Sequence, residues 1–459
     1  MNHDFAGPRA LGRLARTCLA ALGLGLALPA VLPTAAIAQA APAEDVRKVI
    51  HAGRLFDGVS GKLSGPCSIL IAGTRVVAIE EGFVSPVGAE VIDLSNSTVM
   101  PGVIDGHTHM TSLPRTGNSV AKNLTYSPLD VALAATVNAR KVLLSGVTTV
   151  RDLGGLYGAD TALRKAIERG SVVGPRMWNA GEAIGPTAGH NDWSSGLAED
   201  VSRPEFGAGL ADGADAVLAL VRKEHKLGAK VIKILPSGGV VSQNDDPKHK
   251  LMTDAEIAAA VEGAHMGGLK IAAHGHGKAA IDAAVRLGAD SIEHGTYADA
   301  ESFALMREHG TVFLPTLLTT YKLHETAVNR PEALNPSTRA KVLAMGTGYD
   351  KLTRAYKAGV RIGFGSDTGF GENLQEAALM VEAGMPPREV LMAATSGNAD
   401  LIGSQDIGAI AKGRLADIIA VAGNPLEDMH VLEAVEFVMK NGVVYKSGGR
   451  EVPVDLVNP

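Results

Sequence analysis

The sequence predicts an α/β fold, a (β/α)8 TIM-like barrel with a small β-sandwich domain that the N- and C-terminal segments form together. Two observations predict it. After Pro101, apolar runs of about five residues alternate with alanine-rich amphipathic stretches over roughly 300 residues. Short β-branched runs separated by turn residues occupy both ends of the remaining chain. The alternation favours a closed parallel barrel, although the pattern alone leaves an open sheet possible.

Residues 1–40 have the features of a signal peptide. Three arginines precede an apolar run over residues 19–32, and small residues follow in PTAAIAQA. A membrane anchor is the alternative, but the run holds only 14 residues and contains Pro29, whereas a spanning helix needs about 20 residues. We therefore expect cleavage after Ala38 or Ala40, export to the periplasm or the medium, and no membrane attachment of the mature chain.

The mature chain divides into three segments by pattern. Residues 41–100 hold strand-like runs such as VIHAGRLFDG and CSILIAGTRVVAIEEG, which predict the N-terminal part of the β-sandwich. In residues 101–403, the predicted barrel, runs such as KIAAHGHG alternate with helical stretches such as TDAEIAAAVEGAHMGG. Residues 404–459 return to strand-like runs, and we expect them to complete the β-sandwich.

Composition and charge limit the classes of partner. Of the 459 residues, 46% are hydrophobic and 20% are charged, which is typical of a folded globular protein. A formal net charge of −6 and a pI of about 6.2 provide no basic surface for nucleic acid, so we expect a small-molecule or dipeptide partner. Removal of the signal peptide takes Cys18 away and leaves Cys67 alone, so the mature chain cannot form an internal disulfide.

Polar residues of metal-ligand type end several predicted barrel strands, and such strand ends meet at one face of a barrel. His107 and His109, in PGVIDGHTHM, are two residues apart on a strand, so their imidazoles share a face about 6 to 7 Å apart and can reach one metal ion. A solvent-facing pair is the alternative. Asp367 follows the run VRIGFGS and can be a further ligand that also carries protons, or only the cap of the next helix.

Lys233 lies in the middle of VIKIL, at the end of a predicted buried strand. An ammonium group there needs a partner or loses its proton, and it would repel nearby metal ions. Reaction with carbon dioxide would convert the amine into an anionic carbamate whose two oxygens can bridge two metals. A structural lysine paired with a carboxylate explains the residue equally well. The neighbouring Lys230 belongs to the opposite face of the strand.

Three more histidines end apolar runs and are followed by glycine. These are His274 and His276 in AAHGHG, and His294 in SIEHGT. Isolated histidines are more often core or surface residues than ligands, so each gains weight only from the others. Because His274 and His276 share a strand face, the spacing does not choose between them.

The order His-x-His, Lys, His, His, Asp at successive strand ends resembles the pattern of the amidohydrolase superfamily. The flanking motifs look most like its imidazolonepropionase-like and prolidase-like branch, which includes Xaa-Pro dipeptidases, related carboxypeptidases and ochratoxin-hydrolysing amidohydrolases. The motifs are MPGVIDGHTH, TTVRDLGG, VIKILPSGGV, AAHGHG, IEHG, GSDTG and IGAIAKGRLADIIAVAGNPL. The resemblance covers nearly the whole mature chain.

The resemblance implies a binuclear centre of two divalent metal ions, which we expect to be zinc, in a metal-dependent hydrolase barrel. It assigns His107 and His109 to the more buried ion, Lys233 as the bridging carbamate, His274 and His294 to the second ion, and Asp367 as ligand and catalytic proton shuttle. It prefers His274 over His276 because the first histidine of the HxHG motif fills that role in relatives.

The implied activity is hydrolysis of an amide bond next to a free carboxylate, as in dipeptides or N-acyl amino acids such as ochratoxin A. That carboxylate needs a cationic or donor group to hold it, for which His190, in TAGHNDW, and Arg151 are candidates; an ion pair within the barrel is the alternative role of Arg151. Relatives are commonly homo-oligomers. The alternative functions are an imidazolonepropionase-type cyclic-amide hydrolase or deaminase, and a metal-free binding or assembly protein.

Overall fold

The computed structural model describes residues 46–113, 124–201 and 204–457. The chain divides after Ala43, and all described residues belong to the second unit, Glu44–Pro459. The predicted signal peptide, residues 1–40, lies outside the described residues, so its cleavage and the export of the chain stay predictions. In the described part of the chain, every helix is too short or too polar to cross a membrane.

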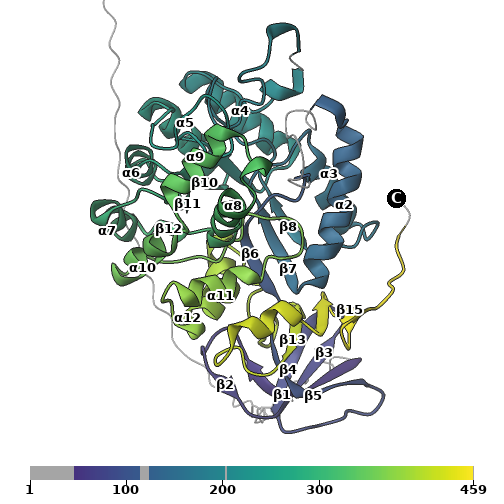
Figure 1. Cartoon of the computed structure of the whole chain (residues 1–459). Helices are drawn as coiled ribbons and strands as arrows, with labels where there is room; N and C mark the ends of the chain where they lie inside the picture. The colour runs from purple at the N-terminus through teal and green to yellow at the C-terminus, as the bar shows by residue number, and fades with distance from the viewer. Residues whose placement is uncertain (1–45, 114–123, 202–203, 458–459) are drawn as a thin grey trace, which may run out of the picture. The chain divides into compact units, whose positions relative to one another are not determined.

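Short parallel strands in two sheets form the centre of the second unit (Figure 1). One sheet has the order β6-β7-β8, the other the order β12-β11-β10-β9, and all neighbouring strands in them are parallel. The bounds are Val103–Thr108 for β6, Val147–Asp152 for β7, Arg176–Asn179 for β8, Val231–Ile234 for β9, Lys270–Gly275 for β10, Ser291–His294 for β11 and Val312–Leu314 for β12. Most of their residues are buried, which explains why these strands read as continuous apolar runs.

Backbone hydrogen bonds connect the two parallel sheets on both sides. On one side, Ile184 forms a parallel bridge with β9. On the other, Phe313 of β12 bridges Ile362, and the Gly106 N–H of β6 donates to the Phe364 carbonyl at 2.9 Å. The predicted α/β class is therefore confirmed. An isolated bridge at Ile362 stands where an eighth strand is expected, so the complete eight-stranded barrel stays a prediction.

Helices follow the parallel strands in the chain and surround them (Figure 1). The bounds are Pro128–Leu144 for α2, Ala159–Glu168 for α3, Ala214–Leu227 for α4, Asp254–Met266 for α5, Lys278–Arg286 for α6, Ala300–His309 for α7, Leu317–Asn329 for α8, Pro336–Met345 for α9, Tyr349–Lys357 for α10, Gln375–Glu382 for α11, Pro387–Met392 for α12 and Asn398–Leu401 for α13. A capping box begins α5: Thr253 accepts from the Glu256 backbone N–H, and the Glu256 carboxylate accepts from the Thr253 N–H. The local sequence thus determines where this helix starts.

A separate nine-stranded sheet combines both ends of the second unit, in the order β16-β15-β14-β13-β5-β1-β3-β4 with β2 beside β1. The bounds are Lys48–Phe56 for β1, Leu63–Ser64 for β2, Cys67–Ala72 for β3, Arg75–Glu81 for β4, Glu90–Pro101 for β5, Ile418–Ala422 for β13, Phe437–Lys440 for β14, Val443–Ser447 for β15 and Arg450–Glu451 for β16. β5 joins the two ends, because it pairs with β1 in parallel and with β13 antiparallel. The strands form one hydrogen-bonded sheet, so a two-layered sandwich stays a prediction.

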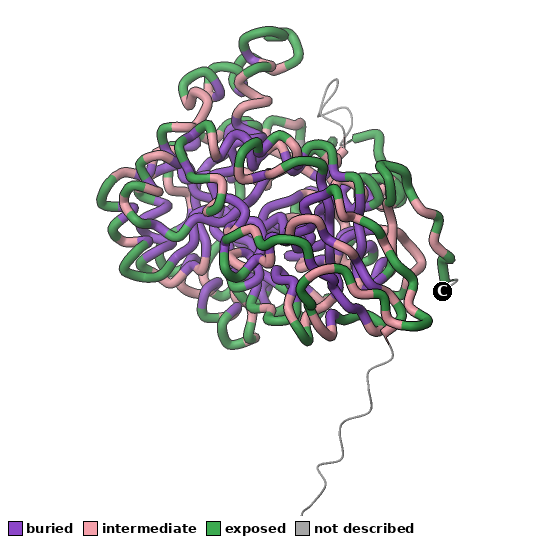
Figure 2. Tube along the Cα trace, turned by 90° about the horizontal axis from the view of Figure 1, so that it is seen from below, coloured by how far each residue is buried: buried purple, intermediate pink, exposed green. Residues whose placement is uncertain are grey.

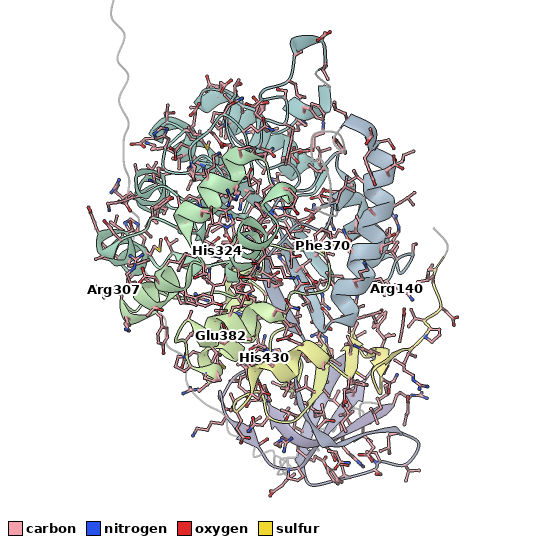
Figure 3. All side chains as sticks on the ribbon, viewed as in Figure 1. Arg140, Arg307, His324, Phe370, Glu382 and His430 are labelled. Carbon is pink, nitrogen blue, oxygen red and sulfur yellow. The ribbon has the colours of Figure 1, made fainter. Side chains whose placement is uncertain are left out.

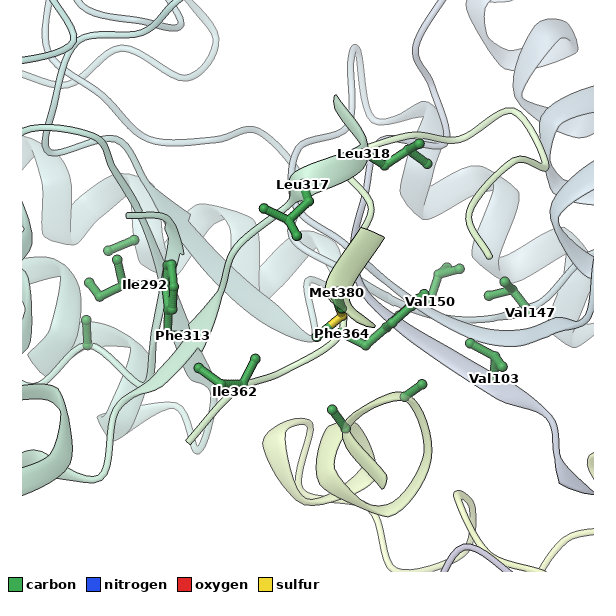
Figure 4. Packing of buried hydrophobic residues seen from close by; sticks show 14 of the residues in the cluster. Val103, Val147, Val150, Ile292, Phe313, Leu317, Leu318, Ile362, Phe364 and Met380 are labelled. Atoms are coloured by element: carbon green, nitrogen blue, oxygen red, sulfur yellow. The ribbon is translucent and has the colours of Figure 1, made fainter. Parts of the chain in front are cut away.

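The buried residues form an apolar core around the parallel strands (Figure 2). Val103, Val150 and Phe313 from the two parallel sheets belong to the same hydrophobic cluster as Leu317 of α8 and Met380 of α11 (Figure 4). The nine-stranded sheet has a cluster of its own, formed mainly by residues of β1, β3, β4, β5, β13 and β14. At about 25 cal/mol per Å² of apolar surface removed from water, these clusters are the main source of stability.

A polar contact ties α2 to the nine-stranded sheet. Arg140 of α2, labelled in Figure 3, donates from Nε to Glu451 Oε1 of β16 at 2.7 Å. Both side chains are partly exposed, so the pair adds at most about 1 kcal/mol to stability. The main effect of the pair is to hold β16 beside α2.

Candidate metal centre

Buried basic side chains gather where the parallel strands end. His107 lies near the end of β6, Lys233 near the end of β9, His274 near the end of β10, and His294 is the last residue of β11. Their exposures are 0%, 2%, 3% and 7%. The carboxyl ends of parallel strands form the active face of such folds, so these residues lie where the sequence predicts a site.

One group of ligand-type atoms consists of His107, His109 and Asp367. Their ligand atoms all lie within 4.8 Å of one another. Asp367 Oδ1 is 3.3 Å from His109 Nε2 and 3.7 Å from His107 Nε2. The Asp367 backbone N–H also donates to the His107 carbonyl at 2.8 Å, which fixes the loop carrying the carboxylate against β6.

A second group consists of His274, His276 and His294, whose ligand atoms also lie within 4.8 Å of one another. The ring centroid of His294 is 4.6 Å from that of His274 and 4.9 Å from that of His276. The geometry therefore does not choose between His274 and His276. The two groups adjoin, because the rings of His107 and His294 are 5.0 Å apart.

Each predicted histidine ligand has one ring nitrogen held by a neighbouring polar atom, which leaves the other nitrogen available. The contacts are His107 Nδ1 to Glu293 Oε2 at 2.7 Å, His109 Nδ1 to the Gly154 carbonyl at 3.2 Å, His274 Nε2 to the Gly238 carbonyl at 3.3 Å, and His294 Nδ1 to Thr316 Oγ1 at 2.8 Å. Metal-binding histidines in proteins are oriented by such contacts on the second nitrogen. Nε2 of His107, buried and without a hydrogen-bond partner, is a ligand atom that a metal ion would satisfy.

The environment of Lys233 also fits a metal centre. Its Nζ is buried and has no hydrogen-bond partner among the described residues, so the structural lysine paired with a carboxylate is not what the structure contains. Burial lowers the pKa of this amine to about 8, against the opposing charges of Glu293 and Asp367. An unpaired ammonium is unfavourable here, whereas a carbamate would provide two anionic oxygens for cations. The residues present thus fit a pair of divalent cations.

The histidines are held in the neutral form that metals bind. Burial lowers the pKa of His107 to about 4, and the positive charge of Lys233 adds to the effect. Burial likewise lowers the pKa of His274 and of His294 well below the usual range. His109 differs: burial opposes its charged form, but its contact with Asp367 outweighs burial and raises its pKa.

Backbone strain is concentrated at the same place. His294, Thr316 and Asp367 have φ angles of 71°, 48° and 54°, in the left-handed region that non-glycine residues seldom adopt. Such conformations persist where the surrounding structure imposes them, and they cluster at functional sites. The strain therefore agrees with a functional role for the two residue groups.

Comparison with known proteins identifies the family. The Amidohydrolase family matches residues 98–446, which is most of the chain. The chain belongs to this family. The matched segment contains all the residues of both groups and Lys233.

Individual relatives place the amidohydrolase in the prolidase-like branch. An ochratoxinase from Aspergillus niger is 34% identical over 426 residues, which is 87% of each chain. The solved structure of a Xaa-Pro dipeptidase with bound methionine in its active site has a TM-score of 0.83 and 37% identity, and covers 87% of this chain and 100% of its own. A prolidase complexed with N-methylphosphonate-L-proline has a TM-score of 0.79 and 33% identity, with coverages of 87% and 99%.

Arg151 forms an ion pair among the parallel strands, which is the alternative role that the sequence suggests for it. Its side chain is 1% exposed, and Nη2 lies 2.8 Å from Glu293 Oε1 in a buried ion pair. Nε donates to the Gly106 carbonyl at 2.6 Å and Nη1 to Ser291 Oγ at 2.9 Å. Substrate binding by Arg151 does not fit this position, because its guanidinium is enclosed by the strands and already engaged.

His190 lies beside the second group. Its ring stacks on that of His274 with centroids 4.5 Å apart, and its Nδ1 is 2.8 Å from Ser242 Oγ. Ser242 in turn contacts the carboxylate of Asp245 at 2.7 Å. The amidohydrolase thus holds His190 in a fixed orientation at the edge of the site, where its substrate-binding role stays a prediction.

Sequence reasoning missed two buried carboxylates that support the site. Glu293 contacts both His107 and Arg151, and Asp105 Oδ1 accepts from the His107 backbone N–H at 3.0 Å. Burial raises the pKa of Asp105 to about 6. Both are acidic residues inside apolar strand runs, VIDG and SIEH, and a charge in such a run is the signal that singled out Lys233.

Proposed function

We propose that this amidohydrolase is an exported binuclear-metal enzyme that hydrolyses an amide bond next to a free carboxylate. The observation that carries the proposal is the unpartnered buried amine of Lys233, whose charge acts on every histidine of both ligand-type groups. A single metal site would need only one group. Two adjoining groups and a residue that can become a bridging anion suit two cations.

In this proposal the centre holds two divalent ions, most simply zinc, which histidine and carboxylate ligands suit. The residues that would hold them are His107 and His109 for one ion, His274 and His294 for the other, with Asp367 as a further ligand and Lys233, as N6-carboxylysine, as a ligand shared by both. The carbamate forms when Nζ adds to carbon dioxide and loses a proton. When bound, such ions supply Lewis-acid polarisation of the scissile carbonyl.

The residues of the chain supply the remaining chemistry. Glu293 and the other contacts on the second ring nitrogens keep the histidines oriented, and burial keeps His107 neutral. Asp367 Oδ1, 3.3 Å from His109 Nε2, is suited to hold a proton and pass it to the departing nitrogen. We propose that the surrounding strands close as an eight-stranded barrel. This barrel excludes bulk water from the side of the site where the strands begin.

The substrate class draws on the relatives. The A. niger relative is an ochratoxinase, and the solved relatives include a Xaa-Pro dipeptidase with bound methionine and a prolidase with a phosphonate derivative of proline. Methionine and proline both carry a free carboxylate. We therefore propose dipeptides and N-acyl amino acids, ochratoxin A among them, as substrates of this dipeptidase- or carboxypeptidase-like enzyme.

The test is a hydrolysis screen of the metal-loaded mature protein against dipeptides and N-acyl amino acids, with small cyclic amides and amino-heterocycles in parallel. Cleavage of the first set supports the proposal, whereas turnover restricted to the second favours the imidazolonepropionase-type alternative. Elemental analysis of protein purified without chelator is expected to give two metal ions per chain. A metal-free protein without activity would favour a binding or assembly role.

A comparison of two lysine variants tests the bridging role of Lys233. Lys233→Ala is expected to abolish activity and lose metal, and short carboxylic acids such as propionate to restore part of both by filling the vacated space. Lys230→Ala, which alters an exposed lysine three residues away, is the matched control and keeps full activity. Full activity of Lys233→Ala would overturn the bridging assignment.

Export and assembly are part of the proposal and are tested separately. N-terminal sequencing of protein secreted from its host is expected to begin at residue 39 or 41. Light scattering of the purified mature protein measures whether it forms the homo-oligomer common among relatives.

A further inference from the structure

A pocket of about 240 Å³ lies beside the second histidine group, at the start of α10. Thr296 and Thr320 line one side of it. Thr296 Oγ1 lies 2.7 Å from His276 Nδ1, and Thr320 donates to the carbonyl of Thr316, whose hydroxyl holds His294. The pocket and the histidines therefore share a wall.

The lining of the pocket also includes a buried cation. Lys351, in the first turn of α10, is 3% exposed, and its Nζ has no hydrogen-bond partner among the described residues. Burial lowers the pKa of this amine to about 8, while the negative charges of Glu376 and Asp367 oppose the effect. Apart from Lys233, no other lysine or arginine of the described chain buries an unpartnered nitrogen.

The nearby carboxylates are engaged elsewhere. Glu376 accepts from the Leu317 and Leu318 backbone N–H groups at 2.9 and 2.5 Å, so it caps the start of α8. Asp350, beside Lys351 in the chain, accepts from Arg354 Nε at 2.6 Å, and its side chain is 80% exposed. The chain thus places a buried positive charge at the pocket without giving it an anion of its own.

The backbone around Lys351 adds to the attraction for an anion. The N-cap of α10 is Gly348, which has φ of 82° and provides no side-chain cap, so the positive end of the helix dipole faces the pocket lining. A Cβ at Gly348 would lie 3.1 Å from Lys351 Cε and 3.4 Å from Nζ. A side chain at this position would crowd Lys351 and Thr320, so glycine leaves room for the amine.

We propose that Lys351 and the first turn of α10 bind the free carboxylate of the substrate, and so select dipeptides and N-acyl amino acids. This inference rests on the proposed function, which needs a cationic or donor group for that carboxylate; Arg151 is enclosed and paired, whereas Lys351 is unpartnered. Charge-assisted hydrogen bonds to a carboxylate are the strong ones, and a desolvated lysine forms them well. The pocket is slightly smaller than the roughly 300 to 1,000 Å³ of drug-sized sites, which suits an amino-acid-sized group.

Kinetics with a matched pair of substrates tests the proposal. N-benzoyl-L-phenylalanine carries the carboxylate, N-benzoyl-L-phenylalaninamide does not, and release of benzoate reports both. Wild-type enzyme is expected to prefer the acid. Lys351→Met is expected to raise KM for the acid roughly 10- to 100-fold with a much smaller change in kcat, and to change KM for the amide far less than KM for the acid.

Lys357→Met is the matched control, because Lys357 lies on the same helix but is exposed. It is expected to behave as wild type with both substrates. Removal of an unpaired buried charge should not destabilise the protein, so Lys351→Met is expected to keep the wild-type Tm. Lys351→Gln replaces it if the methionine variant does not fold.

A binding measurement separates failure of this inference from failure of the proposed function. Calorimetry of the holoenzyme with L-phenylalanine and with L-phenylalaninamide is expected to show tighter binding of the acid, and loss of that preference in Lys351→Met. Hydrolysis by wild type with equal preference for acid and amide overturns the role of Lys351 and leaves amide hydrolysis intact. Absence of any hydrolysis, together with acid-selective binding that depends on Lys351, overturns the proposed function and retains the anion site.

Discussion

Glu293 Oε2 lies 2.7 Å from His107 Nδ1, on the side of the imidazole opposite to the nitrogen that faces Asp367. The other oxygen of the same carboxylate pairs with Arg151 at 2.8 Å. Burial alone would raise the pKa of Glu293, but Arg151 and His107 bring it down to about 2. A permanently charged carboxylate therefore accepts a hydrogen bond from the Nδ1–H of His107, which keeps the Nε2 lone pair available.

Glu293→Gln is expected to weaken metal binding about 10- to 100-fold, because a neutral amide makes the His107 imidazole a poorer and less firmly oriented ligand. Competition with a coloured zinc chelator measures the affinity. Glu262→Gln, at an exposed position of α5, serves as the control and should bind zinc like wild type. Unchanged affinity in Glu293→Gln would contradict the orienting role of this carboxylate.

Arg151→Met is expected to lower the free energy of unfolding by about 3 to 5 kcal/mol, since it leaves the charge of Glu293 buried and unpaired. Urea unfolding followed by circular dichroism measures the change, and Arg222→Met, on the exposed face of α4, provides the comparison. A substrate-binding residue would behave differently. Raised KM with unaltered stability would restore that role to Arg151.

Variants at His274 of β10 and at His276, which directly follows β10, decide which of the two histidines binds metal. His274→Ala is expected to reduce the metal content from two ions per chain to one, and His276→Ala to retain both, because the family pattern favours the first histidine of HxHG. Elemental analysis of each purified variant gives the answer. The reverse result would assign the ligand role to His276, which the distances equally allow.

Lys440 gives the protein a pH dependence far from the metal centre. It is 6% exposed, its Nζ donates to the Gly174 carbonyl, and burial lowers its pKa from 10.5 to about 8. Between these two pH values the unfolded chain binds more protons than the folded one, so the free energy of unfolding rises with pH, by at most about 1.4 kcal/mol per pH unit.

Urea unfolding at pH 7, 8, 9 and 10 measures this rise. In Lys440→Met the rise should be smaller by the contribution of Lys440, while Lys233 and Lys351 still contribute, so the difference between wild type and variant changes over the window above pH 8 and is constant below it. Parallel curves for the two proteins across the whole range would show that Lys440 does not titrate in this way.

The sequence predicted those parts of the site that lie within strands or directly follow them. His107 and His109 follow from the two-residue period of a strand, and Lys233 from the cost of a charge inside an apolar run. His274 and His276 share the same period, so no local rule could separate them, and the folded distances do not separate them either. The α/β class followed from the alternation of runs, whereas closure of the sheets depends on contacts between distant segments.

Other features depend on tertiary contacts that no local pattern contains. Lys351 lies in YDKLTRAYKAG, whose charged residues are typical of an exposed helix, yet the fold turns this one side chain inward. Arg151 was ambiguous for the same reason, because only the folded structure shows that Glu293, far away in the chain, lies beside it. Pairing across long separations decides which charges are buried and which are solvated.

Because β5 pairs with a strand near the other end of the second unit, it stays partly unpaired during synthesis of the chain. Thr98 of β5 donates to the carbonyl of Gly423, a partner 325 residues later, and β13 pairs along the same edge. While the chain is being made, β5 therefore has an unpaired border until almost the last residues emerge. Unpaired strand borders bind other chains. A premature stop before Gly403 would leave that border open for good, so truncated products of this gene are expected to aggregate and be degraded rather than accumulate as smaller, working enzymes.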